Sequence, residues 1–103
     1  MATVTRNNAV EIVVASLKEV FAQTGSPAPD NIHDDTVLVG NDAVIDSLGV
    51  VSLIVEIEQR VESDYGVSIT LANDKAMSAR NSPFRTVGVL SDHVVATAAE
   101  VAQ

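Results

Sequence analysis

The strongest constraint on this chain is the helical spacing of the apolar side chains in residues 44–58, VIDSLGVVSLIVEIE, and just beyond. At about 3.6 residues per turn, one face of this segment is entirely apolar. That face consists of Val50, Leu53, Ile54, Ile57 and Val61. Gly66 then supplies a residue suited to end a helix. The pattern predicts a helix from about Ser47 to Asp64.

A second apolar line, Leu48, Val51 and Val55, lies on the same predicted helix but is rotated away from the first. Acidic residues accompany it: Glu56, Glu58, Glu62 and Asp64. Because a surface helix needs only one apolar face, the second line has two interpretations. It packs under the long loop or the last helix, or it is an exposed apolar rib suited to a partner with a basic surface.

Further helices are predicted at both ends of the chain. The first spans about residues 8–22, with Asn7 or Asn8 as its cap, and its apolar face consists of Val10, Val13, Val14, Leu17 and Phe21. Thr86 is the predicted N-cap of the last helix, whose apolar face consists of Val87, Leu90, Val94, Ala98 and Val101. Residues 73–79 allow a short helix, and residues 67–70 read as an extended segment.

Gly25, Pro27 and Pro29 prevent the first helix from continuing. The next helix is predicted to begin only at about Ser47, so the connection between them is long. A long connection would let the first two long helices run roughly parallel. We therefore expect one all-α domain over residues 1–103, a small four-helix bundle with three longer helices and one short helix.

The composition narrows the classes of function. The 103 residues are 47% hydrophobic but only 3% aromatic, which favours a helical core of Val, Leu, Ile and Ala. Six basic and fourteen acidic residues give a net charge of −8, which would repel nucleic acid. No cysteine is present, and His33 and His93 lie far apart, so no metal site is predicted. Without an apolar run of about 18 residues or a signal-peptide core, we expect no membrane insertion and a cytoplasmic protein.

Ser47 stands where the central helix should begin, and its local sequence allows two roles. Serine is one of the preferred N-cap residues. The N-terminus of a helix also favours bound anions, so a phosphate-linked group attached to Ser47 would suit the same position. Local sequence leaves both roles open.

The segment D-S-L, followed by a helix of the form x-x-V-x-L-[IV]-x-x-[LI]-E, resembles the acyl carrier protein family and its peptidyl and aminoacyl relatives. The matching residues are Asp46, Ser47, Leu48, Val51, Leu53, Ile54, Ile57 and Glu58. YGVSIT and FRTVGVLSDHV resemble the family's passage out of the second helix and the opening of its last helix. The likeness extends over nearly the whole chain from residue 8.

The resemblance implies a non-catalytic carrier with 4′-phosphopantetheine attached to Ser47. Asp46 matches the acid that helps the phosphopantetheinyl transferase to place its magnesium ion. The apolar line of Leu48, Val51 and Val55 matches the family's partner-contacting positions, and the acids Glu56, Glu58 and Glu62 extend that surface. The arm would hold acyl groups as thioesters and present them to successive acyl-transferring enzymes. We expect a monomer.

Four residues depart from typical fatty-acid carriers. Ile45 replaces a small residue, Gly49 and Ser52 replace acids, and Arg60 adds a positive charge. These departures favour a specialised, free-standing carrier in a specialised lipid or secondary-metabolite pathway, loaded by an acyl- or aminoacyl-activating ligase.

Two alternatives to an acyl carrier stay open. One is an aminoacyl or peptidyl carrier for non-ribosomal chemistry. The other is a helical adaptor with no prosthetic group, which uses the apolar rib alone. An enzyme is least favoured, because no His or Lys lies near Ser47 in sequence to act as its base.

Overall fold

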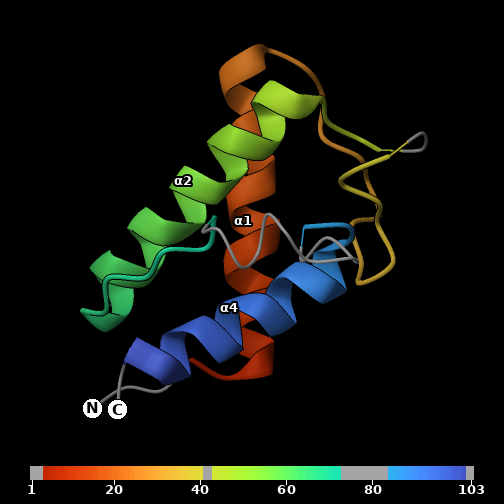
Figure 1. The fold of residues 1–103 in the computed structure, drawn as a ribbon. Coiled ribbons are helices and arrows are strands. Elements are labelled where there is room, and N and C mark those ends of the chain that lie inside the picture. The colour runs from red at the N-terminus through yellow and green to blue at the C-terminus, as the bar shows by residue number, and fades with distance from the viewer. Residues whose placement is uncertain (1–3, 41–42, 73–83, 102–103) are drawn as a thin grey trace.

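The computed structural model describes residues 4–40, 43–72 and 84–101, which form a small all-α fold. It contains helices α1 (Arg6–Thr24), α2 (Ser47–Tyr65) and α4 (Val87–Val101), and these described residues include no strand (Figure 1). The predicted four-helix bundle is therefore wrong, because this part of the chain forms three helices. The short helix predicted over residues 73–79 lies outside the described residues.

Residues 67–71, which follow α2, form an extended segment that is hydrogen-bonded to both α2 and α4. Val67, Ile69 and Leu71 are buried and alternate with exposed residues, which is the period of an extended chain. The Leu71 N–H donates to the carboxylate of Glu58 on α2 at 2.9 Å. The imidazole Nε2 of His93 on α4 lies 2.9 Å from the Leu71 carbonyl oxygen. Both polar groups of one buried residue are thus satisfied by side chains of two different helices.

Helix α1 extends two residues beyond the prediction at each end. Its N-cap is Thr5, whose hydroxyl oxygen accepts a hydrogen bond from the Asn8 N–H at 3.1 Å, so the predicted caps Asn7 and Asn8 are wrong. Gly25 ends the helix in the left-handed conformation with φ of 75°, which glycine adopts without a Cβ clash. Gly66 ends α2 in the same way with φ of 68°, as predicted.

Helices α1 and α2 run antiparallel. Phe21 and Thr24, near the end of α1, line one pocket together with Gly49 at the start of α2. Asn8, near the start of α1, lines another pocket with Tyr65 at the end of α2. The predicted parallel arrangement is wrong because the long loop turns back on itself and returns the chain to the end of α1 (Figure 1).

The returning loop also caps α4. Val37 pairs with Thr86 in an isolated antiparallel bridge, and the neighbouring Leu38 is buried and donates its N–H to the Arg85 carbonyl at 2.8 Å. The backbone N–H groups of the first three residues of α4, which have no acceptor within the helix, find acceptors here. Val87 donates to the Thr36 carbonyl, Gly88 to the Asp34 carbonyl and Val89 to the Thr86 hydroxyl; Leu90 then makes the first bond of the helix, to the Thr86 carbonyl. The predicted N-cap, Thr86, is confirmed.

Arg6 ties the start of α1 to the loop and to α4. Its guanidinium lies 2.6 Å from Asp92 and 3.2 Å from Asp34, and it also donates to the Gly88 carbonyl at 3.3 Å. The hydrogen bond to Asp92, followed by that to Asp34, raises the pKa of Arg6. Arg6 therefore stays charged at any physiological pH, and all three ion-pairing side chains are exposed enough to be screened by salt.

The core is built almost entirely from aliphatic side chains of the three helices and the two segments that cover them. Its largest fully buried members are Leu17, Leu38, Leu53, Ile57, Leu71 and Leu90. None of α1, α2 and α4 combines the length and the apolar character that a membrane crossing requires.

Candidate functional site

The start of α2 is capped by Asp46. Asp46 has an extended backbone, with φ of −89° and ψ of −178°, and its Oδ1 accepts a hydrogen bond from the Gly49 N–H at 2.8 Å. Ser47 is the first residue inside the helix. The interpretation of Ser47 as the N-cap is therefore wrong, because the neighbouring carboxylate takes that role. The side chains on either side of Ser47, those of Asp46 and Leu48, are exposed.

Gly49 lets the chain before α2 lie close to the first helical turn. A Cβ at this position would lie 3.0 Å from the Ile45 Cβ and 3.3 Å from Oδ1 of Asp46. Such contacts are tighter than most Cβ contacts in proteins, so the neighbouring atoms would have to shift slightly, and one of them is the capping oxygen itself. Two of the departures from the carrier pattern, Ile45 and Gly49, are thus neighbours in space.

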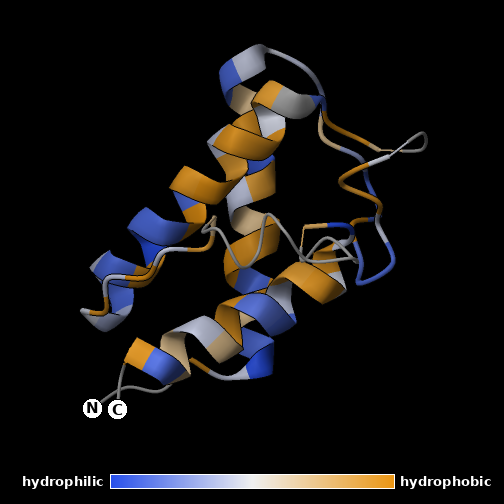
Figure 2. Cartoon of the chain, in the orientation of Figure 1, coloured by the Kyte–Doolittle hydropathy of each residue, from blue (hydrophilic) through white to orange (hydrophobic). Residues whose placement is uncertain are grey.

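The second apolar line of α2 is exposed. Leu48, Val51 and Val55 have 74%, 57% and 45% of their surface accessible, and we call these three residues the apolar rib. On the other face of the same helix, Leu53 and Ile57 are buried, as predicted. Figure 2 shows that apolar residues gather in the first half of α2, while its last turns are hydrophilic. The interpretation of this line as part of the core is therefore wrong.

The acids beside the rib have different surroundings. Glu56 forms an ion pair with Arg60 at 3.4 Å, and the Glu58 carboxylate accepts a hydrogen bond from the Leu71 N–H. Glu62 and Asp64 are exposed. Of the predicted partner-binding acids, Glu62 is thus the one whose side chain is exposed, whereas Glu56 and Glu58 are half-buried and have partners within the chain. Spacing along α2 places them near the rib but does not reveal these partners.

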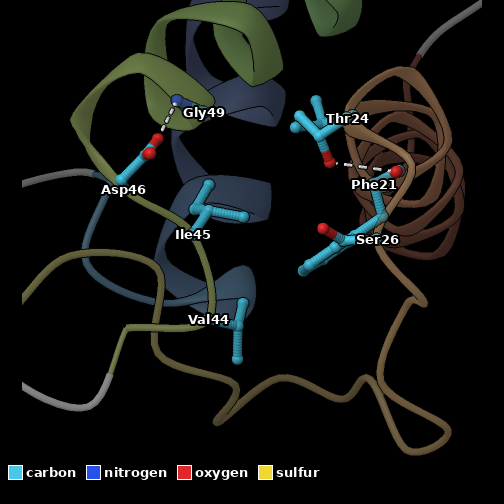
Figure 3. A pocket seen from close by; sticks show the side chains of 8 residues that line it. Phe21, Thr24, Ser26, Val44, Ile45, Asp46 and Gly49 are labelled. Carbon is cyan, nitrogen blue, oxygen red and sulfur yellow. Dashed lines mark hydrogen bonds between the residues drawn. The ribbon is translucent and has the colours of Figure 1, made fainter.

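A pocket of about 180 Å³ lies between the end of α1 and the start of α2 (Figure 3). Its lining is mixed: apolar side chains are joined by the hydroxyl groups of Thr24 and Ser26 and the carboxylate of Asp46. The lining residues are Val20, Phe21, Thr24, Ser26, Val44, Ile45, Asp46 and Gly49. Except for Asp46, none of them was predicted as a site residue, because they come from three segments that only the antiparallel arrangement of α1 and α2 brings together.

The two histidines contribute to the fold. His33 Nδ1 accepts a hydrogen bond from the Asp35 N–H at 3.1 Å, within the loop. His93 lies next to the Leu71 carbonyl, and its ring meets the Phe84 ring edge-on, with centroids 5.7 Å apart. Neither ring lines the pocket beside α2.

The site therefore consists of a capped helix start at Asp46 and Ser47, an exposed rib that begins at the next residue, and a small pocket on the α1 side. Comparisons of the chain with protein families, curated proteins and solved structures find no match.

Proposed function

We propose that this chain is a carrier protein that holds acyl intermediates on a 4′-phosphopantetheine arm attached to Ser47 and delivers them to partner enzymes. The observation that supports this most is the exposed rib of Leu48, Val51 and Val55, which begins one residue after Ser47 on the same helix. Three exposed aliphatic side chains on one helix face cost solubility unless another molecule covers them. The D-S-L motif supplies the reason for placing them beside this serine.

The residues around Ser47 fit the proposed arm. Exposed neighbours on both sides leave room for a covalent group at the helix start. The N-terminal end of α2 carries the positive end of the helix dipole, which stabilises the negative charge of a phosphodiester. The arm would supply a terminal thiol on which acyl groups are held as thioesters.

Asp46 can serve both the fold and the loading reaction. Its Oδ1 caps the helix, but a carboxylate has two oxygens and several acceptor positions. The second oxygen is therefore available to the magnesium ion of a phosphopantetheinyl transferase. In this proposal the chain itself performs no catalysis; it positions the serine and is recognised by the transferase.

Partner recognition combines the rib with the acidic end of α2. Glu62 and Asp64 are exposed and would attract basic docking surfaces, whereas Arg60 neutralises Glu56 nearby. This weakened acidic character supports a specialised pathway with its own acyl- or aminoacyl-activating ligase over a housekeeping fatty-acid synthase. A cytoplasmic, monomeric protein completes the proposal.

An adaptor without a prosthetic group is the second candidate, because the same exposed rib would serve it equally well. Incubation of the full chain with coenzyme A and a phosphopantetheinyl transferase, followed by intact-mass measurement, separates the two. We expect one added arm on the wild type and on Ser52→Ala, a control serine of the same helix, and none on Ser47→Ala. An unmodified wild type, tested with several transferases, would favour the adaptor.

A further inference from the structure

The pocket beside the start of α2 is a feature that the carrier function proposed above does not use. Asp46 and Gly49, which bracket Ser47 in sequence, form one wall of it. Phe21 from α1 lies on the opposite side, with Ile45 between (Figure 3), and Val20 from α1 also lines the pocket. Two residues close to Ser47 in sequence therefore line the pocket, and the rib residues Leu48, Val51 and Val55 are not among its lining residues.

The pocket has the size and character for a small branched apolar group. An enclosed apolar cavity of about 150 Å³ is large enough to take up benzene, so this open and partly polar pocket of about 180 Å³ has room for a group of comparable bulk. Val20 is buried, while Phe21, Val44 and Ile45 are half-buried and leave apolar surface facing the pocket. Covering that surface is favourable in proportion to its area.

Hydroxyl groups stand at the α1 side of the same pocket. The Thr24 hydroxyl donates to the Phe21 carbonyl at 3.0 Å, so its oxygen keeps the capacity to accept a hydrogen bond. Ser26 is exposed beside it, and its backbone N–H also donates to the Phe21 carbonyl, at 3.1 Å. A ligand that enters from the Asp46 side thus meets aliphatic surface first and hydroxyl groups afterwards.

This order matches the chemistry of the first part of a phosphopantetheine arm. After the phosphate and one methylene comes a carbon with two methyl groups, followed by a hydroxyl-bearing carbon and an amide; the thiol follows only after a second amide. The group nearest to Ser47 that needs apolar contact is therefore the dimethyl carbon, and the polar groups after it can bond to Thr24 and Ser26. An acyl chain would have to fold back along the whole arm to reach the same place.

We propose that this pocket binds the dimethyl (pantoyl) part of the arm and lays the arm across the seam between α1 and α2. The inference rests on the proposed function, because it requires the arm on Ser47. It predicts that the thiol end leaves the protein from the α1 side of α2, while the rib stays free for partners.

The test is nuclear magnetic resonance on the full chain, loaded with pantetheine whose two pantoyl methyl groups carry ¹³C. We expect cross-peaks from these methyl groups to the Phe21 ring and the Ile45 side chain. Ser26→Leu, which fills the pocket, should abolish them. Ser68→Leu, at another exposed serine outside helices, is the matched control and should retain them.

The measurement separates this inference from the proposed function, because intact mass reports loading independently. A protein that loads fully but shows no pantoyl cross-peaks to the pocket would overturn the inference and leave the carrier function standing. So would a hexanoyl-loaded protein in which the hexanoyl chain, and not the pantoyl methyl groups, contacts Phe21 and Ile45. Since the wild type alone decides these outcomes, a folding defect in Ser26→Leu leaves the test intact.

Discussion

The carboxylate of Glu58 on α2 accepts a hydrogen bond from the backbone N–H of Leu71, with 2.9 Å between oxygen and nitrogen. Leu71 is fully buried, so its N–H depends on this side chain for a partner. The carrier resemblance places Glu58 at the end of the helix motif, where a role at the surface was expected. The hydrogen bond to Leu71 gives Glu58 a structural role as well.

Removing the carboxylate of Glu58 should therefore destabilise the fold. We expect Glu58→Ala to lower the free energy of unfolding by about 1.5–3 kcal/mol, the usual contribution of a hydrogen bond to a charged group. Glu58→Gln should lose less, because its amide oxygen can still accept. Glu62→Ala, at an exposed acid one turn later, should stay within about 0.5 kcal/mol. Urea unfolding measures all three, and equal stabilities would contradict the proposed role.

Substitutions of Asp46 should separate helix capping from arm loading. Asn caps helices about as well as Asp, whereas Ala should cost about 0.5–2 kcal/mol. Asp46→Asn should thus melt close to the wild type but accept the arm more slowly, because a neutral amide binds magnesium less well than a carboxylate. Thermal unfolding and a loading time course measure the two effects. Loading at the wild-type rate by Asp46→Asn would rule out a role for its charge.

Restoring an acid at position 49 should not be a neutral change. A side chain there crowds Ile45 and the capping oxygen of Asp46, and overpacking of this kind costs about 1–3 kcal/mol. Replacing a helical glycine returns at most about 1 kcal/mol, so the crowding prevails. We expect Gly49→Asp to be less stable than the wild type, while Ser52→Glu, on the next turn, is close to neutral. A Gly49→Asp variant that melts above the wild type would show that the segment before α2 yields easily.

The apolar rib should contribute to binding and little to stability. Val51→Ala and Val55→Ala should each change the free energy of unfolding by no more than about 0.5 kcal/mol, because both side chains are exposed. Leu53→Ala on the buried face of the same helix should cost about 2–5 kcal/mol. Transfer rates with a loading enzyme, measured beside stability, should fall for the rib variants. Unchanged rates would assign recognition to another surface.

Ser16 offers a stabilising substitution. Its hydroxyl is fully buried in α1 and has no hydrogen-bond partner among the residues that the structure describes, an arrangement that costs about 1–3 kcal/mol for the lost hydration. Alanine removes the hydroxyl and is the better helix former, so Ser16→Ala should raise the melting temperature. Ser91, equally buried, donates to the Val87 carbonyl at 2.7 Å, so Ser91→Ala should bring no such gain. A loss of stability in Ser16→Ala would point to an unrecognised partner for the hydroxyl.

The three long helices and their buried faces could be predicted from the amino-acid sequence alone. Leu53 and Ile57 could be assigned to the core and Thr86 and Gly66 to helix ends, because the helical period and the capping preferences act over a few residues. The exposure of the rib could not be decided in the same way. Two apolar lines on one helix are equivalent until the surrounding elements are placed.

Features that depend on segments far apart in sequence became clear only in the folded structure. Asp46 and Ser47 are both good caps, and the choice between them followed from how the chain enters α2. The antiparallel course of α1 and α2, and hence the pocket, depends on where the long loop returns, which its Gly and Pro residues do not specify. Glu58 has a structural role because Leu71 lies outside the helices, and its buried N–H takes the Glu58 carboxylate as its acceptor. Local propensity acts along the chain, whereas the burial of polar groups is settled only once the core has formed.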